Sequence, residues 1–245
     1  MLHVGADACR VGWLTVILRE GADWKVDIFQ NIFELWDQCK DARLILLDVP
    51  IGLRESESNE RCCDKDARRL LGRKRGPSVF PAPCRPAVYA ETYEEASGIN
   101  ERMTGRRLSK QVWGIIPKIR QVDQLLLAQM PSRLRIREIH PEVLFWAFAS
   151  FTPMRHSKKT REGFSERKGV LLNVYDRTDD IVSYALSKFP RREVSADDIL
   201  DALAAAVTAS VEEQHLSSIP KTAEVDSCGL SMEMVYCVTR SKSTK

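Results

Sequence analysis

The sequence predicts an α/β fold built on a mixed β-sheet. Three short β-rich runs follow one another at the N-terminus, a segment with helical periodicity comes next, and an apolar run then ends in an aspartate. Closely joined strands pair antiparallel, whereas a strand reached through a helix lies parallel to an earlier one. We therefore expect an α/β sandwich whose fourth strand lies beside the first.

The first 50 residues give the strongest pattern. The β-rich runs cover residues 2–8, 12–18 and 24–30, with tight turns between them. Apolar residues at helical spacing predict a helix over 32–40, and the apolar run 44–49 predicts a buried central strand.

Helical spacing resumes over 109–129, where Pro117 predicts a kink or a break. Strict alternation over 134–140 predicts a strand, and Pro141 then opens a helix that reaches residue 149.

The C-terminal part is predicted to be mainly helical. One helix is expected to reach about residue 189, and Ser195 is a good N-cap for a second that reaches about residue 213. Alternation over 230–238 predicts a strand that extends the sheet at its edge or seals the core.

Residues 53–109 are rich in charge, proline and glycine. The prolines between residues 77 and 86 are dense enough to predict irregular structure, and long irregular segments inside a domain are often functional. We interpret this basic, Pro-rich segment as an insertion that lines a site. The expected organisation is one domain over 1–245 with insertions at about 53–132 and 150–177.

Composition excludes several classes of protein. The 37 Lys and Arg residues nearly balance 34 Asp and Glu residues, and the 44% hydrophobic content argues against a disordered chain. No apolar stretch approaches the roughly 20 residues of a membrane span, and no secretory signal is recognisable. The seven cysteines form no Cys-x-x-Cys pair, so we expect reduced thiols and a cytoplasmic location.

Four aspartates stand where a surface residue is not expected: Asp7, Asp48, Asp198 and Asp201. Burial of an unpaired carboxylate costs several kcal/mol, so a shared cation would explain them together. Mg²⁺ or Mn²⁺ suits such oxygen ligands, and two ions can promote phosphodiester cleavage. Alternatives remain for each: a turn role for Asp7, backbone hydrogen bonds for Asp48, and a helix start for Asp198.

Glu138 and His140 share one face of the predicted strand and are further catalytic candidates. His140 could act as a general base or a ligand near neutral pH. The alternative is a buried histidine that is hydrogen-bonded near Pro141, and Glu142 could simply complement the helix dipole.

Two local clusters carry the positive charge. Residues 60–86 hold eight basic and three acidic residues, and residues 155–168 hold six basic and two acidic ones. Such clusters attract a phosphate backbone, so the expected partner is a nucleic acid that is recognised by backbone or shape. The candidate substrate-binding residues are Arg73, Lys74, Arg75, Arg85, Lys110, Lys158 and Lys159. A solvated helix face is the alternative for part of the first cluster.

Several short motifs carry a resemblance that spans most of the chain. They are Gly5-Ala6-Asp7, Asp48-Val49-Pro50-Ile51-Gly52-Leu53, Pro81-Ala82-Pro83-Cys84-Arg85-Pro86, Glu138-Ile139-His140-Pro141-Glu142, Ser157-Lys158-Lys159-Thr160 and Asp197-Asp198-Ile199-Leu200-Asp201-Ala202. With them the sequence resembles the family called domain of unknown function 429, whose members are predicted nucleases. The helix of this chain that carries Asp198 and Asp201 is similar to a helix of RuvC-type Holliday-junction resolvases. On the fourth strand these resolvases have a glutamate where this chain has Asp48.

The resemblance implies an RNase H-like, mixed five-stranded sheet with helices on both faces, on which the aspartates converge. The leading hypothesis is thus a metal-dependent nuclease with a two-metal mechanism. The alternative is a non-catalytic module of the same fold that binds nucleic acid or protein. Phosphoryl transfer from a nucleotide is a third hypothesis, but the chain has no Gly-rich phosphate loop.

Overall fold

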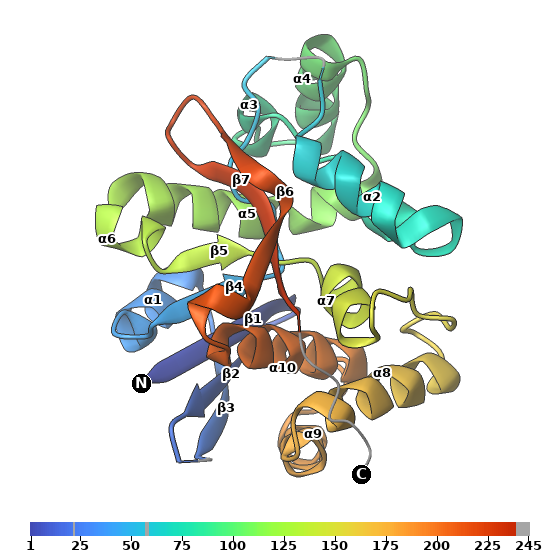
Figure 1. The fold of residues 1–245 in the computed structure, drawn as a ribbon. Coiled ribbons are helices and arrows are strands. Elements are labelled where there is room, and N and C mark those ends of the chain that lie inside the picture. Colours follow the sequence, from blue (N-terminus) through green and yellow to red (C-terminus); the bar gives the residue numbers. More distant parts are fainter. Residues whose placement is uncertain (22, 57–58, 239–245) are drawn as a thin grey trace.

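Five strands form the central sheet of the protein. The structure is a computed structural model, and it describes residues 1–21, 23–56 and 59–238. The strands lie in the order β3-β2-β1-β4-β5, as Figure 1 shows. Their bounds are β1 Leu2–Cys9, β2 Gly12–Arg19, β3 Trp24–Phe29, β4 Leu44–Leu47 and β5 Ile136–Glu138. β1 is antiparallel to β2 and parallel to β4, so the expected mixed sheet is confirmed.

The pairing of β1 with β4 determines where the first two aspartates lie. Ala6 of β1 is the register partner of Leu47 of β4, and the Asp48 N–H donates to the Ala6 carbonyl oxygen at 3.3 Å. Asp7 and Asp48 follow these partners directly. The two aspartates therefore lie side by side where the parallel strands end.

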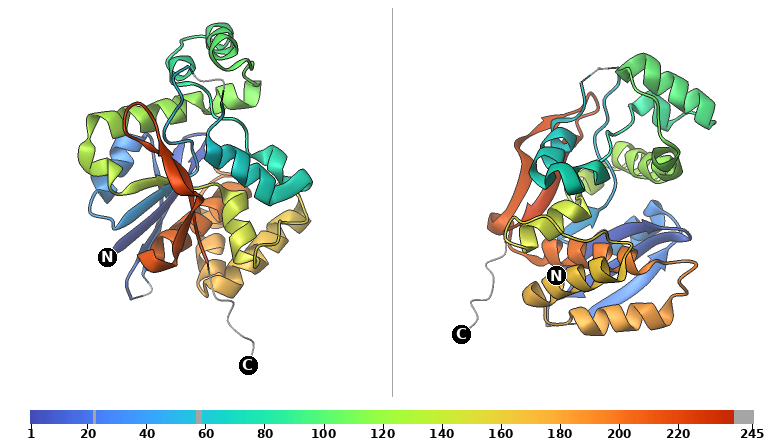
Figure 2. Two further views of the ribbon diagram at one scale, coloured as in Figure 1. Left: turned by 45° about the horizontal axis from the view of Figure 1, so that its top comes forward. Right: turned by 90° about the vertical axis from the view of Figure 1, so that its right-hand side faces the viewer.

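Helices cover both faces of the sheet, as predicted (Figures 1 and 2). α1 Ile32–Cys39 and α5 Lys110–Ala128 pack on one face, where Val4 and Ile45 are buried. The helices of the other face are α7 Pro141–Phe148, α8 Arg161–Val174, α9 Thr178–Lys188 and α10 Ala196–Ser210.

α10 is the helix that lies closest to the sheet. Its residues from Ile199 to Ala209 are all buried, and it packs against β1, β2 and β4. Side chains alternate along a strand, so Gly5 and Asp7 both face α10 while Val4 and Ala6 point to the opposite layer. A glycine at position 5 lets the helix backbone approach the strand next to Asp7.

Irregular structure was expected over residues 53–109, but only part of the segment, including residues 79–84, is irregular. The segment contains α2 Cys62–Arg75, the short helix η1 Gly76–Ser78, α3 Arg85–Val88 and α4 Tyr93–Thr104. Its prolines stand in connections and in first helical turns, where no backbone N–H is needed. α5 likewise runs through Pro117 without a break. Figure 2 shows α4 at the end of the molecule opposite α9.

The C-terminal half departs from the prediction in two places. The single helix expected to reach residue 189 is two helices, α8 and α9, and a short α6 Met130–Arg133 precedes β5. The predicted tail strand, β7 Ser231–Cys237, pairs with β6 Leu216–Val225 in a separate two-stranded sheet that follows η2 Glu213–His215. β7 does not extend the main sheet. It does seal a core, because Met232 and Met234 are buried against residues of α2 and α7.

Within the described ranges, none of the helices combines the length and the apolar character that a membrane crossing requires.

Candidate metal centre

Three aspartates that are remote in the sequence meet at one end of the sheet. Asp7 lies in β1, Asp48 directly follows β4, and Asp201 lies in α10. One carboxylate oxygen from each lies within 4.8 Å of the others. Figure 1 shows the three elements converging. A common centre for these three residues agrees with the sequence prediction.

Local sequence explains why α10 presents Asp201 here. The helix begins with a capping box, in which the Ser195 hydroxyl accepts the Asp198 N–H and the Asp198 carboxylate accepts the Ser195 N–H. Asp201 is one turn further along, on the face that packs against β1. The alanines around it have short side chains, which let α10 lie close to β1, so the Asp201 carboxylate comes near Asp7.

Burial and mutual repulsion make the three carboxylates hard to ionise. Burial raises the pKa of Asp7 well above its usual range, and the charges of Asp48 and Asp201 add to the effect. Burial raises the pKa of Asp48 to about 8 despite the nearby Lys158. Burial also raises the pKa of Asp201 to about 6, and Lys158 limits the rise. The three groups together therefore favour a bound cation.

Lys158 supplies one positive charge to this centre. Its Nζ lies 2.7 Å from Asp201 Oδ2 and 3.6 Å from Asp197 Oδ2. The residue was predicted to bind substrate, and the structure shows that its ammonium group also pairs with a predicted metal ligand. The other oxygen, Asp201 Oδ1, is buried and has no hydrogen-bond partner among the described residues. An unpartnered buried carboxylate oxygen is the donor that a metal ion would use.

The structure does not bring Asp198 into this group of three carboxylates. Asp198 lines the same cleft, but its carboxylate accepts the Ser195 N–H at 2.9 Å and caps α10. This is the helix-start alternative stated for it above.

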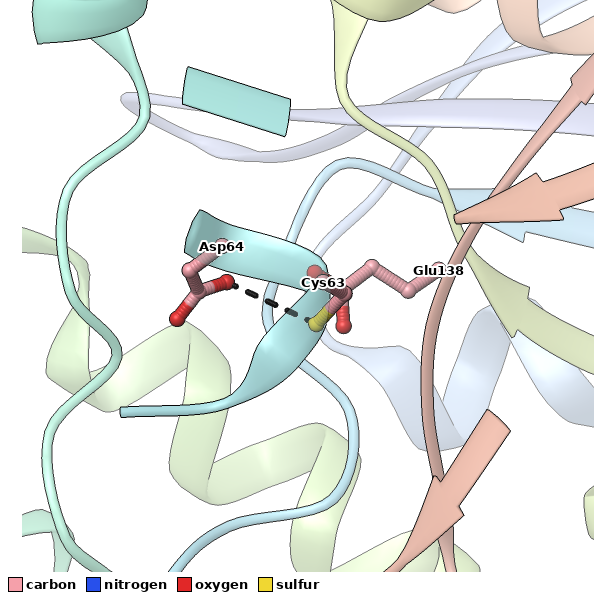
Figure 3. A group of neighbouring side chains, drawn as sticks. All are labelled: Cys63, Asp64 and Glu138. Carbon is pink, nitrogen blue, oxygen red and sulfur yellow. Dashed lines mark hydrogen bonds between the residues drawn. The ribbon is translucent and has the colours of Figure 1, made fainter. Parts of the chain in front are cut away.

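Glu138 belongs to a second buried cluster, in which the positive charge is already present. Arg61 Nη1 donates to Glu138 Oε2 at 2.8 Å, and Arg61 Nη2 donates to Asp64 Oδ1 at 2.5 Å. The side chains of Arg61 and Glu138 are 2% and 3% exposed, so water does not screen this pair. Figure 3 shows Glu138 beside Cys63 and Asp64 at the start of α2. Arg61 fills the place of a cation, so these acids do not form a free metal site.

The Arg61–Glu138 pair holds the chain that follows Asp48. Glu138 Oε2 accepts the Ile51 N–H at 2.6 Å, and Arg61 Nη1 donates to the carbonyl oxygens of Ile51 and Gly52. Glu138 therefore has a positioning role beneath the centre.

His140 adopts the arrangement of the structural alternative. Its Nδ1 accepts the Glu142 N–H at 3.2 Å, and its Nε2 lies 3.4 Å from the Ser78 carbonyl oxygen. Burial lowers the pKa of His140 to about 4, so the ring is neutral at pH 7. The ring lines the cleft, but both of its nitrogens are engaged.

Sequence reasoning gave too little weight to Glu142. Its Oε1 accepts from Arg167 Nη2, whereas Oε2 is buried and has no partner in the part of the chain that the structure describes. The residue also lines the cleft. Its place two residues beyond His140, after the carboxyl end of β5, could have identified it. The partner Arg167 lies 25 residues further along and gave no such signal.

Asp7 and Asp48 line a cleft of about 340 Å³, and the buried Asp201 lies next to them. Arg75, Lys158 and Lys159 line the cleft, as does the polar Gln111. Part of the Pro-rich segment lines it too, through Ser78, Val79 and Phe80, as expected.

The other basic candidates are distributed differently. Arg73 and Lys74 are exposed in the last turn of α2, whereas Lys110 lies over the ring of Tyr93 with its Nζ 3.2 Å from the centroid. Arg85 is buried and pairs with Glu55, Asp123 and Asp226. Arg85 therefore joins structural elements and is not available at the surface, which contradicts its predicted role in substrate binding.

Comparison with known proteins identifies the family. No curated protein and no solved structure matches this sequence. One family model, described as "Protein of unknown function (DUF429)", matches residues 5–225, a range that contains every residue of the metal centre and of its cleft except Met234. This match covers most of the chain and agrees with the resemblance seen in the motifs. The chain belongs to the DUF429 family.

Proposed function

We propose that this protein is a nuclease that hydrolyses phosphodiester bonds with the help of a divalent metal ion. Asp7, Asp48 and Asp201 would hold the ion, which is Mg²⁺ or Mn²⁺. The observation that carries the proposal is the meeting of three carboxylate oxygens within 4.8 Å, two of which belong to Asp7 and Asp48, residues that line a cleft.

The residues present fit such an ion. Hard divalent cations prefer carboxylate oxygens, and within residues 1–21, 23–56 and 59–238 the buried Asp201 Oδ1 has no hydrogen-bond partner. The raised pKa values of the three aspartates mean that the folded protein pays an energetic penalty for their charge, which a cation would relieve. When bound, the ion would supply Lewis-acid activation of water and stabilisation of developing negative charge.

The surroundings of the centre favour a polyanionic substrate. Arg75, Lys158 and Lys159 line the cleft, and Arg73 and Lys74 are exposed in the adjoining turn of α2. Basic groups that lie around a cleft can bind a phosphate backbone, and the binding is driven by the release of counterions. They would place the backbone over the aspartates without reading its sequence.

The chain's own residues then have distinct parts in the proposed reaction. The three aspartates would bind and orient the metal ion. Lys158 holds Asp201 in place, because its Nζ lies 2.7 Å from Asp201 Oδ2. His140 Nδ1 accepts the Glu142 N–H, so the ring proton of the neutral form lies on Nε2, which faces the Ser78 carbonyl oxygen. His140 consequently orders the start of α7 and is not the proton acceptor.

The test is cleavage of single-stranded, duplex, hybrid and branched nucleic acids by the purified chain, with Mg²⁺, with Mn²⁺ and with EDTA. Asp7→Asn should abolish metal-dependent cleavage while the circular dichroism spectrum stays unchanged. Asp66→Asn is the matched control, because Asp66 pairs only with the exposed Arg69 on α2 among its described contacts. No cleavage with either metal, or full cleavage by Asp7→Asn, would reject the nuclease. Nucleic-acid binding that persists in EDTA without any cleavage would instead favour the non-catalytic module.

A further inference from the structure

The acids around the metal centre differ in whether they already have a counterion. Glu138 pairs with Arg61, and Glu142 pairs with Arg167. Asp198 accepts the Ser195 N–H and Asp197 accepts the Ser195 hydroxyl, both at the positive end of α10. Asp197 also lies 3.6 Å from Lys158 Nζ, which is closer to Asp201 at 2.7 Å. These outer acids are therefore compensated by the protein and add little to the charge that a metal ion would meet.

The inner acids are compensated only in part. Asp7, Asp48 and Asp201 carry three negative charges when ionised, and the described residue that pairs with this set is Lys158. Three negative charges and one positive charge leave a net charge of −2. One divalent cation neutralises that charge. A second would leave a net charge of +2 in a buried site beside a fixed ammonium group, which is electrostatically unfavourable.

Lys158 is fixed in place, unlike most surface lysines. Arg75 of α2 donates to the carbonyl oxygens of Met154 and Arg155 at 2.8 and 3.0 Å. Glu166 of α8 accepts the N–H groups of Arg155 and His156 at 2.8 and 2.9 Å. The loop that carries Lys158 is thus held from two helices.

Gly163 fixes the same loop at its other end. A Cβ at this position would lie 1.8 Å from the Ser157 carbonyl oxygen. The loop and the first turn of α8 therefore make backbone contact directly before Lys158. The backbone before Lys158 is thus held in place, and from it the ammonium group lies 2.7 Å from Asp201 Oδ2.

We propose that Lys158 supplies the second positive charge of the site, so that one divalent cation per chain, and not two, completes the centre. This inference rests on the proposed function, because it assumes that the three aspartates hold a metal ion. It replaces the two-metal mechanism expected from the sequence with one metal ion and one tethered ammonium group.

The experiment measures the number of Mn²⁺ ions bound per chain by titration calorimetry, with electron paramagnetic resonance of the bound Mn²⁺ as an independent readout. The wild-type protein should bind one ion and give the spectrum of isolated Mn²⁺. Lys158→Met should bind two and give a spin-coupled spectrum. Lys168→Met is the matched control, because Lys168 lies on α8 outside the cleft lining and pairs with Asp179, and it should bind one. Lys158→Arg keeps the charge and should also bind one.

The outcomes separate this inference from the proposed function. Two ions in the wild-type protein would overturn the inference and leave the metal centre intact. A folded Lys158→Met variant that still binds one ion would overturn it too. No Mn²⁺ binding by the wild-type chain would remove the metal centre, and the proposed nuclease with it. If Lys158→Met does not fold, the number of Mn²⁺ ions bound by the wild-type protein and by Lys158→Arg is still decisive. One ion in each supports the inference, and two ions in either overturns it.

Discussion

Gly5 of β1 lies against the backbone of Ala206 in α10, so close that a Cβ on the glycine would be 2.1 Å from the Ala206 nitrogen. It would also lie 2.3 Å from the carbonyl oxygen of Ala202, the residue after Asp201. This backbone contact sets the separation of strand and helix two residues from Asp7. The spacing of the metal centre therefore depends on a residue that has no side chain.

Gly5→Ala should separate β1 from α10 and damage the centre. We expect a loss of about 1–3 kcal/mol in the free energy of unfolding, because the atoms met by the new Cβ are backbone atoms that cannot rotate away. Mn²⁺ affinity should fall as well, since Asp7 and Asp201 lie on the displaced elements. Urea unfolding and calorimetry measure the two effects.

Gly114→Ala is the control for this substitution. Gly114 lies inside α5, and apart from the adjoining backbone of its own helix no atom of the described residues lies within 4 Å of the position of its Cβ. Alanine there should stabilise the protein by about 1 kcal/mol and leave Mn²⁺ binding unchanged. Unchanged Mn²⁺ affinity in Gly5→Ala would contradict the role given to this contact.

The aspartates of the centre could be predicted from the sequence, because a charged residue within an apolar segment is easy to recognise. Asp48 ends an apolar strand, and Asp201 interrupts a helix of alanines and leucines. Each would be costly if it were unpaired, so a common site was the economical explanation. The strand order that brings Asp7 beside Asp48 also followed from local patterns, since a short turn and a helical crossover have different consequences for strand direction.

The pairing of side chains could not be predicted in the same way. Arg61 meets Glu138 across 77 positions, and Arg167 meets Glu142 across 25. Neither pair leaves a recognisable pattern in the local sequence, because its two members come together only when the helices dock on the sheet. Glu138 therefore seemed to be as free as Asp48, although it has a buried counterion.

The error over the Pro-rich segment has a different cause. Proline excludes only the interior of a regular hydrogen-bonded pattern and is favoured in the first turn of a helix. Pro77 and Pro86 occupy such first turns. Two of the four prolines thus marked helix starts, whereas Pro81 and Pro83 lie in the irregular connection between them.

Arg61→Met should be among the most destabilising single substitutions in the protein. It would leave Glu138 and Asp64 buried without a counterion, and loss of one partner of a buried ion pair costs about 3–5 kcal/mol. Urea unfolding should show this loss. Arg69→Met on the same helix removes an exposed ion pair with Asp66 and should cost about 0.5 kcal/mol or less. Similar losses in the two variants would mean that the buried pair contributes no more than a surface pair.

Asp48 should make the stability of the metal-free protein depend on pH. Its pKa is about 8 in the folded protein, whereas an aspartate in an unfolded chain has a pKa of about 4. The folded state then binds more protons than the unfolded state within this window, so the free energy of unfolding falls as the pH rises through it. We expect a contribution of roughly 1–2 kcal/mol, because Asp48 is half-buried and faces the cleft.

Asp48→Asn isolates that contribution. Between about pH 4 and pH 8 the stability of this variant in EDTA should decline less than that of the wild-type protein. Metal binding should show the opposite trend in the wild-type chain, since Mn²⁺ competes with the proton and its affinity should rise with pH. Parallel stability curves for the two proteins would show that Asp48 is ionised equally in the folded and unfolded states.

Gly163→Ala should detach the lysine loop from the metal centre without altering any charged residue. The new Cβ would meet the Ser157 carbonyl oxygen, so the loop must move and carry Lys158 away from Asp201. The variant should then bind two Mn²⁺ ions, as expected for Lys158→Met, and its thermal midpoint in EDTA should fall because the aspartates lose their counterion. Gly169→Ala on the same helix is the control, since nothing lies within 4 Å of its Cβ position, and it should stabilise α8 by about 0.5–1 kcal/mol. If both alanine variants keep wild-type cleavage and Mn²⁺ binding, the loop can shift without consequence, and the position of Lys158 does not depend on Gly163.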